Sequence, residues 1–245
     1  MKLLLCVPTY NESESILKLL TRIDAMRPKI QQDLGVSLEL LVIDDNSPDG
    51  TAALVRSRGL PWVSILEREE KGGLGPAYIA GFKAGLAGGY AFLGEMDADL
   101  SHEPESLVDM LRPVSSDGSH LTIGTRWMPG GKVVNWPIVR QLISRAGTGY
   151  ARLALGIKLR DVTSGYRIFR REVLERIDLD LIEARGYGFQ IEMTLKTLDL
   201  GFQVKEVPIT FVERVGGVSK MSKGIVLEAL WKVTLWAAQR RIQRR

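Results

Sequence analysis

Short apolar segments alternate with helical segments over the first hundred residues, and this alternation limits the folds open to the chain. The runs Lys2 to Val7, Leu38 to Ile43, Val63 to Leu66 and Tyr90 to Leu93 are typical of strands buried on both faces. Strands that alternate with helices form a largely parallel sheet covered by helices on both sides. The sequence therefore predicts an α/β fold with a mostly parallel central sheet.

The pattern loosens after the fourth strand, but further elements can still be assigned. The later strands are expected at Leu121 to Gly124, Arg167 to Arg170, Val204 to Val207 and Ile209 to Val212. The main later helices are expected at Val139 to Leu155, Phe189 to Leu200 and Ile225 to about Arg241. Near the amino terminus, Pro28 to Gly35 is expected to be a connection.

Polar side chains follow three of the first four strands at the point where each strand ends. The clusters are Pro8 to Glu12, Asp44 with Asp45, and Asp97 with Asp99. The carboxyl ends of parallel strands meet at one edge of the sheet, where open α/β sheets bind their ligands, so these clusters are expected to converge. The alternative is that each acid only caps the helix that follows it.

The converging clusters have the composition of a nucleotide pocket. Tyr10 can stack on a base, and Glu12 and Asp45 can accept hydrogen bonds from ribose hydroxyls or base nitrogens. The chain lacks the Gly-x-Gly-x-x-Gly pattern of dinucleotide enzymes, and the loop Lys71 to Gly75 lacks the Gly-Lys-Ser/Thr ending of a P-loop. The expected nucleotide pocket therefore carries neither of these fingerprints.

Asp97 and Asp99 are two carboxylates spaced i and i+2 after the fourth strand. On a strand such side chains share a face, and two like charges so close need a cation between them, or one stays protonated. Mg²⁺ and Mn²⁺ are natural candidates because they take oxygen ligands and leave room for substrate phosphates. The pair is therefore predicted to form a metal–diphosphate site, with a solvated acidic turn as the alternative.

Three cations are candidate phosphate contacts, namely Arg126, Arg214 and Lys220. Arginine offers a planar fork of donors and lysine a mobile point charge, and both suit phosphate oxygens. A solvated surface residue is the alternative for each of them. His102 follows Asp99 closely and can order its surroundings, or it is a hydrogen-bonded loop histidine.

Composition limits the compartment and the partners. The single cysteine, Cys6, allows no intramolecular disulfide and is expected in the core. The amino-terminal apolar run is too short for a signal peptide, and no segment approaches the ~20 apolar residues of a membrane-spanning helix. Seven of the 33 basic residues, but one of the 29 acidic residues, lie between Lys220 and Arg245, so an anionic partner is expected there. The tail has no module that reads nucleic acid, and no nucleic acid is expected as a partner.

Taken in order, these motifs resemble those of the dolichyl-phosphate mannose synthases, a polyprenyl-phosphate branch of the inverting glycosyltransferase family 2. The resemblance covers nearly the whole chain. Asn46 and Thr125 depart from it mildly, because a small residue and serine are usual at these two positions. The matching segments are Pro8 to Glu12, Asp44 to Thr51, Gly73 to Gly75, Met96 to His102, Gly124 to Arg126, Thr163 to Arg167 and Arg214 to Lys220.

The resemblance implies the nucleotide-diphospho-sugar transferase fold (GT-A, Rossmann-like) with an added C-terminal amphipathic helix, and it implies a role for each matched residue. The residues that would hold the nucleoside are Pro8, Tyr10, Glu12, Ile43 and Asp45. Those that would hold or line the Mg²⁺ or Mn²⁺ site are Asp97, Ala98 and Asp99. Those that would contact the diphosphate, the sugar or the acceptor phosphate are Arg126, Arg214 and Lys220. Asp99 and Arg126 would take part in catalysis.

The implied reaction moves mannose from GDP-mannose to dolichyl or polyprenyl phosphate with inversion, giving polyprenyl-phosphate β-mannose. The acceptor phosphate is already ionised and is its own nucleophile, which suits a chain with two histidines and no visible triad. Two alternatives stay open. The same scaffold could use UDP-glucose or a UDP-amino sugar, or the chain could be a nucleotide-sugar-binding subunit without turnover.

The carboxyl-terminal segment fits an acceptor at a membrane surface. Apolar and Trp-rich residues from Ile225 to Trp236 precede four arginines, a pattern typical of an interfacial helix. A helix packed on the domain is the alternative. We expect residues 1–218 to form the catalytic domain and residues 219–245 a basic amphipathic helix. The chain is expected to be peripheral on the cytoplasmic face of a membrane, with a membrane-anchored subunit as a further candidate partner.

Overall fold

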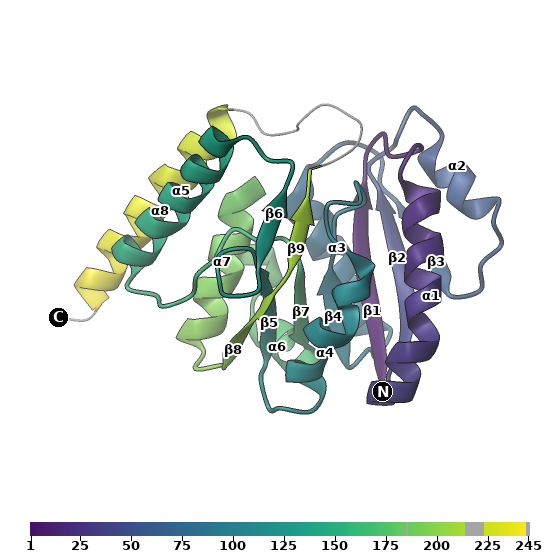
Figure 1. The fold of residues 1–245 in the computed structure, drawn as a ribbon. Helices are drawn as coiled ribbons and strands as arrows, with labels where there is room; N and C mark the ends of the chain where they lie inside the picture. Colours follow the sequence, from purple (N-terminus) through teal and green to yellow (C-terminus); the bar gives the residue numbers. More distant parts are fainter. Residues whose placement is uncertain (185, 214–222, 244–245) are drawn as a thin grey trace.

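A seven-stranded sheet forms the centre of the computed structural model, which describes residues 1–184, 186–213 and 223–243 (Figure 1). The strand order is β3-β2-β1-β4-β7-β5-β8, and only β7 runs antiparallel to its neighbours. The predicted α/β fold with a mostly parallel sheet is therefore confirmed. The strands are β1 (Lys2–Thr9), β2 (Ser37–Asp44), β3 (Val63–Glu67), β4 (Phe92–Glu95), β5 (Leu121–Thr125), β7 (Arg167–Arg170) and β8 (Val204–Pro208).

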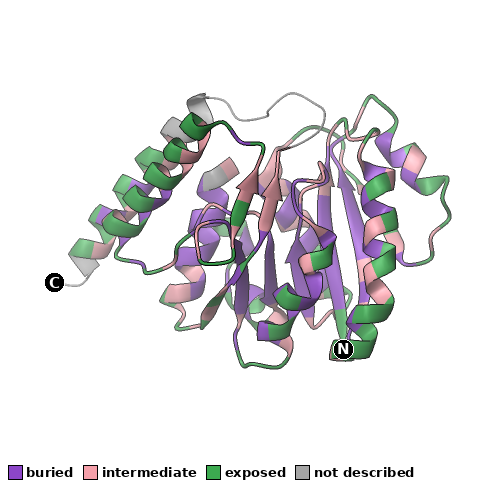
Figure 2. Ribbon diagram, viewed as in Figure 1, coloured by how far each residue is buried: buried purple, intermediate pink, exposed green. Residues whose placement is uncertain are grey.

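Helices cover both faces of this sheet, and Figure 2 shows the strands as the buried centre between them. In β1, Leu3 and Leu5 face one layer while Leu4 and Cys6 face the other, because successive side chains of a strand alternate. Cys6 is buried, as predicted. The first layer contains α1 (Ile16–Leu34), α2 (Thr51–Arg56), η1 (Pro104–Ser106) and α4 (Leu107–Ser115). The second contains α3 (Leu74–Ala87), α6 (Arg171–Arg176), η2 (Leu179–Leu181) and α7 (Gly186–Asp199).

The connection expected at Pro28 to Gly35 is wrong, because α1 continues through Pro28 as far as Leu34. Ile30 in this last part of the helix is fully buried. Its packing against the core outweighs the backbone hydrogen bond that a proline removes. The helix then ends at Gly35, which has a left-handed φ of 64°.

A small second sheet and a further pair of helices complete the fold. β6 (Lys132–Val134) pairs with β9 (Thr210–Val212), whose Phe211 bridges to His102 in the loop after β4, and α5 (Ile138–Leu155) lies beside α8 (Lys223–Gln243) (Figure 1). Val233 and Ala237 of α8 are buried with Ala151 and Ile191 in a separate apolar cluster. The described part of α8 thus packs on α5 and α7, and the domain division at residue 218 stays a prediction. None of the helices that the structure describes is both long enough and apolar enough to span a membrane.

Candidate functional site

The carboxyl ends of β1, β2 and β4 lie together at one edge of the sheet, as predicted. β1 pairs with both other strands, and the register puts Pro8 opposite Ile43. The loop after each strand contains a residue with a positive φ, namely Asn11 at 58°, Asn46 at 55° and Leu100 at 65°. Asparagine adopts this left-handed region readily, whereas the conformation is costly for Leu100, and such strained residues concentrate at functional sites. The three polar clusters therefore converge, and each lies in a loop with a left-handed residue, which is strained in the case of Leu100.

Asp45 is held by the loop that precedes α3. Its Oδ1 accepts a hydrogen bond from Arg68 Nη1 at 2.8 Å, and its Oδ2 accepts the backbone N–H groups of Gly72 at 3.2 Å and Gly73 at 3.3 Å. Asp45 therefore fastens the glycine-containing loop to the end of β2. No spacing in the sequence points to Arg68 as its partner, so this residue was missed.

The other predicted nucleoside residues divide between the loop after β1 and the core. Lys71 Nζ lies 3.9 Å from the centroid of the Tyr10 ring, so the same loop covers the aromatic face that was expected to stack on a base. Glu12 is half-buried and accepts a hydrogen bond from Ser15 Oγ at 3.0 Å. The Ile43 side chain is fully buried against α3. Only its backbone can therefore border a ligand.

Asp97 and Asp99 lie in the loop after β4, not on the strand itself. The expectation that they share a strand face is therefore wrong, and their arrangement depends on hydrogen bonds of the loop. Asp99 Oδ1 accepts the backbone N–H of Ser101 at 3.0 Å, and the backbone N–H of Asp97 donates to His102 Nδ1 at 3.2 Å. Ala98 between the two acids is buried.

His102 is the buried support of this acidic loop. Its ring stacks on Tyr166 at a centroid distance of 5.0 Å and meets Phe211 edge-on at 5.3 Å. Burial lowers the pKa of His102 to about 4, against the opposing effect of Asp99. The ring is therefore neutral at neutral pH, and its Nδ1 lone pair accepts the Asp97 N–H. Both alternatives for His102 apply. It is a buried, hydrogen-bonded loop histidine, and its hydrogen bond orders the acidic loop.

A buried polar network lies behind the acidic loop. Glu95 is fully buried, and Gln190 Nε2 donates to its Oε2 at 2.6 Å. Arg167 is also fully buried and donates to the backbone oxygens of Ser164 at 2.7 Å and Val162 at 2.8 Å. Burial raises the pKa of Glu95 to about 7, although the charge of Arg167 opposes this shift. The network holds the loop from Asp161 to Tyr166 beside β4.

The raised pKa of Glu95 predicts a pH dependence of stability. A carboxyl that binds its proton more tightly when folded stabilises the fold at low pH, and this contribution is lost as pH rises through the folded pKa. Relative to Glu95→Gln, the wild-type free energy of unfolding should fall on the order of 3 kcal/mol between pH 4.5 and 7. Denaturant unfolding of both proteins at the two pH values measures this. His102 titrates equally in both, and parallel stability curves would contradict the prediction.

Arg126 forms a buried ion pair with Asp161. Its side chain is 6% exposed, and its Nε and Nη2 each lie 2.7 Å from a carboxylate oxygen of Asp161. Nη2 also donates to Thr163 Oγ1 at 3.1 Å. Asp161 therefore holds Arg126, the predicted phosphate contact, in place. The sequence analysis did not identify Asp161 as this partner. The only signal in the sequence was that Asp161 lies just before the matched segment Thr163 to Arg167.

The segment from Asp161 to Tyr166 connects Arg126 with the acidic loop. A Cβ added at Gly165 would lie 3.8 Å from Asp97 Oδ1, so the segment passes close to this acid. Phe211 of β9 makes the same connection from another side, since its ring contacts His102 and lies 5.3 Å from the Arg126 guanidinium. The structure thus brings the predicted cation and the predicted acids into one site.

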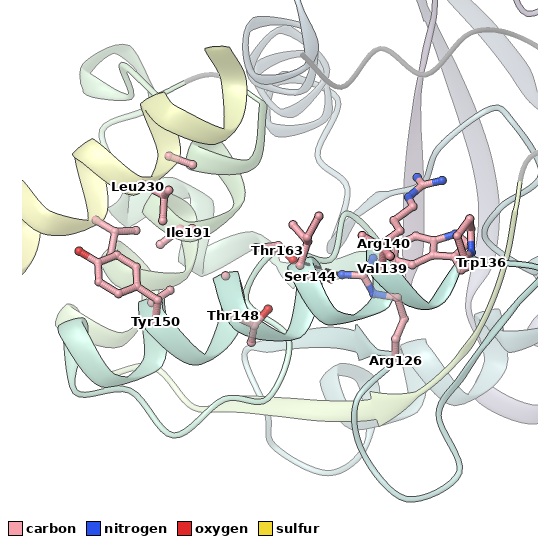
Figure 3. Close-up of a pocket in the computed structure, with 16 residues that line it drawn as sticks. Arg126, Trp136, Val139, Arg140, Ser144, Thr148, Tyr150, Thr163, Ile191 and Leu230 are labelled. Atoms are coloured by element: carbon pink, nitrogen blue, oxygen red, sulfur yellow. Dashed lines mark hydrogen bonds between the residues drawn. The ribbon is translucent and has the colours of Figure 1, made fainter. Parts of the chain in front are cut away.

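A cavity of about 430 Å³ begins at Arg126 and extends along α5. Figure 3 shows Arg126, Arg140 and Trp136 at one end, and Ile191 and Leu230 at the other. Arg140 pairs with Glu213 and lies 4.2 Å from the centroid of the Trp136 ring. The cavity is therefore an apolar space with arginines at one end, within the size range of ligand pockets.

The oxygen donors of Asp97 and Asp99 fit Mg²⁺ or Mn²⁺ bound together with a diphosphate. Within the described residues, no group of three or more His, Cys, Asp or Glu side chains could hold a metal ion. Mg²⁺ is usually bound through one or two carboxylates, with water and substrate phosphates completing its coordination. The two carboxylates in the loop after β4 match this pattern. Two other predicted contacts, Arg214 and Lys220, lie outside the described residues.

Comparison with known proteins identifies the family. The sequence pattern of the family described as "Glycosyl transferase family 2" matches residues 4–178. The chain belongs to this family. Among the relatives of this family 2 member is a protein of Micrococcus luteus named undecaprenyl-phosphate mannosyltransferase, which is 50% identical over 96% of this chain and 94% of its own length. Another is the polyprenol monophosphomannose synthase of Mycolicibacterium smegmatis, 46% identical over 98% of this chain and 89% of its own length.

Solved structures agree with the fold of this family 2 glycosyltransferase. Glucosyl-3-phosphoglycerate synthase from Mycobacterium tuberculosis, solved with Mn²⁺, UDP-glucose and phosphoglyceric acid, aligns with a TM-score of 0.72. The alignment covers 97% of this chain and 80% of that chain at 20% identity. The predicted GT-A fold is thus confirmed.

Proposed function

We propose that this family 2 glycosyltransferase transfers mannose from GDP-mannose to a polyprenyl phosphate, with inversion at the anomeric carbon. The observation that carries this proposal is the cavity, which is apolar along α5 and has Arg126 and Arg140 at the end nearest the acidic loop. An acceptor with an anionic head and a long apolar chain matches such a space. The names of the two bacterial relatives support the same acceptor and the same sugar.

On the donor side, the loops after β1 and β2 bind the nucleoside. Glu12 and Asp45 accept hydrogen bonds from the ribose or the base, and Tyr10 provides a stacking face once Lys71 moves aside. Asp97 and Asp99 hold Mg²⁺ or Mn²⁺, and the ion, when bound, neutralises charge on the diphosphate leaving group. The backbone at Pro8, Ile43 and Ala98 borders the same pocket, and Arg214 and Lys220 are proposed to contact the phosphates.

On the acceptor side, Arg126 and Arg140 orient the lipid phosphate. A phosphate oxygen attacks the anomeric carbon of mannose, and the bond from that carbon to the diphosphate breaks with both electrons leaving on the diphosphate. The acceptor is already ionised, so no side chain needs to remove a proton. The chain's task is to bring two anions together and to exclude water, which positioned arginines and an apolar cavity achieve.

The same helices suit attachment to a membrane surface. Of the strongly exposed large apolar side chains in the described residues, all but Met1 and Leu181 lie on α5 or α8. The sequence pointed to the C-terminal helix, whereas α5 carries more of this surface, including Leu142 and Leu153. Exposed apolar residues beside arginines are typical of an interfacial helix. We propose a peripheral position on the cytoplasmic face, with a membrane-anchored subunit as a candidate partner.

Leu142→Glu should weaken binding of the protein to vesicles containing anionic lipid, because it puts a charge on the apolar surface of α5. Leu181→Glu is the matched control, since Leu181 is 63% exposed and Leu142 is 60% exposed, but Leu181 lies in η2. Vesicle co-sedimentation measures both variants. A similar loss for the two, or no loss for Leu142→Glu, would contradict attachment through α5.

His102→Leu should raise the Mn²⁺ concentration for half-maximal activity about tenfold, because the Asp97 N–H loses its acceptor. In His102→Asn the amide oxygen replaces Nδ1, so this variant should keep most of the affinity. Metal titration of the transfer rate compares the two. Equal losses would mean that ring packing, rather than the acceptor, supports the acidic loop.

The proposed function is tested with the purified full chain, Mn²⁺ and a prenyl phosphate in detergent. GDP-mannose, UDP-glucose and UDP-N-acetylglucosamine are supplied in separate reactions, and glycolipid formation is measured. Transfer from GDP-mannose alone supports the proposal. Transfer only from a UDP-sugar would replace the donor, and nucleotide-sugar binding without any transfer would favour the non-catalytic alternative.

A further inference from the structure

Gly147 lies in the interior of α5, where glycine is unfavourable, and the protein's own packing does not require it. Glycine in a helix interior is less stable than alanine because of its greater conformational freedom. On α3, Gly81 and Gly85 are explained by packing, since an added Cβ would lie 2.6 Å from Ile43 Cδ1 and 2.3 Å from Leu93 Cδ2 respectively. A Cβ at Gly147 would meet no atom within 4 Å. The space beside Gly147 is therefore not filled by the chain itself.

That empty space is part of the cavity. Gly147 lines it, and on α5 it lies about one turn after Ser144 and one turn before Ala151, which line the cavity as well. The neighbouring Thr148 also lines the cavity and is 3% exposed, yet its Oγ1 has no hydrogen-bond partner among the described residues. Buried hydroxyls usually have a hydrogen-bond partner, and of the four buried hydroxyls without one in the described residues, only that of Thr148 lines the cavity. Both observations indicate that a ligand completes this part of α5.

We propose that Gly147 is a specificity-determining residue for the acceptor, because it leaves room for the methyl-branched chain next to the phosphate. This inference rests on the proposed function. With the phosphate at Arg126 and Arg140, the chain that follows passes Ser144 and then Gly147 as it extends along α5. A prenyl chain carries regularly spaced methyl branches, which need more width than a straight alkyl chain. A side chain at Gly147 would occupy that width.

Gly149 provides a matched control on the same helix. An added Cβ at Gly149 also meets nothing within 4 Å, but Gly149 is exposed and does not line the cavity. Gly147→Ala and Gly149→Ala should therefore both raise Tm by about 2 °C, because each removes a helix-interior glycine. Only Gly147→Ala should lower kcat/KM for a prenyl phosphate, by about tenfold, which is the usual effect of one methyl-sized group in an apolar pocket.

The experiment measures transfer of mannose by the full chain in detergent to a prenyl phosphate and to a straight-chain alkyl phosphate of equal carbon number. Gly147→Ala should reduce use of the prenyl acceptor several-fold more than use of the alkyl acceptor, and Gly149→Ala should change neither. Equal kinetics for the two variants, or equal losses on both acceptors, would overturn the role of Gly147. Absence of transfer by the wild-type chain to either acceptor would overturn the proposed function itself, and this inference with it.

Discussion

Asp99→Asn is expected to lower mannosyl transfer by about a thousandfold while leaving the fold intact. The asparagine Oδ1 can still accept the backbone N–H of Ser101, so the turn after β4 keeps its hydrogen bond. The variant loses the negative charge with which Asp99 would hold a divalent ion. Its free energy of unfolding should change by less than about 0.5 kcal/mol. The variant therefore tests the charge of Asp99 separately from the geometry of the loop, whereas Asp99→Ala would remove both the charge and the hydrogen bond from Ser101.

Steady-state transfer rates at increasing Mn²⁺ measure the effect of Asp99→Asn. Asp97→Asn should behave similarly, whereas Asp117→Asn removes an exposed carboxylate elsewhere and should retain full activity. High Mn²⁺ should recover only part of the rate, because the charge that neutralises the ion and orients it is missing. Near-normal transfer in both Asp97→Asn and Asp99→Asn would contradict metal binding by these two residues. Arginine side chains would then have to neutralise the diphosphate.

The sheet could be predicted because its strands carry local signals. β1, β2 and β4 are largely buried on both faces, so each appears in the sequence as a mostly apolar run followed by polar residues. Pro28 misled the prediction, because proline is a strong local signal while the burial of Ile30 depends on distant parts of the chain. The unusual position of β7, antiparallel between β4 and β5, is likewise set by long-range pairing.

The site was predictable to the extent that topology dictates it. Parallel strands must end at one edge, so Tyr10, Asp45 and Asp97 were expected to converge, and their strands do. The partners of these residues were not predictable. Arg68, which holds Asp45, follows a different strand, and Asp161, which holds Arg126, is 35 residues away in the chain. Such pairs are made by tertiary contacts that leave no spacing pattern in a single sequence.

The ion pair of Arg126 with Asp161 yields the second large expected effect. Asp161→Ala should lower the free energy of unfolding by about 3 kcal/mol, because it leaves the buried Arg126 guanidinium without its carboxylate partner. It should also abolish most transfer, because the Arg126 side chain is no longer held in one position. Arg126→Lys should also fail in transfer, since lysine cannot reproduce the two bonds from Nε and Nη2. Thermal unfolding and initial rates at saturating acceptor measure both losses.

The double variant Arg126→Met with Asp161→Leu separates structural from catalytic importance. Replacing both members of a buried ion pair by apolar residues of similar size is often neutral for stability, so this variant should regain most of the Tm lost in Asp161→Ala. It should still transfer mannose at least about a hundredfold more slowly than wild type, because the cation at the head of the cavity is gone. Recovery of transfer together with stability would mean that the pair only braces the segment from Asp161 to Tyr166, and that Arg140 alone receives the acceptor phosphate.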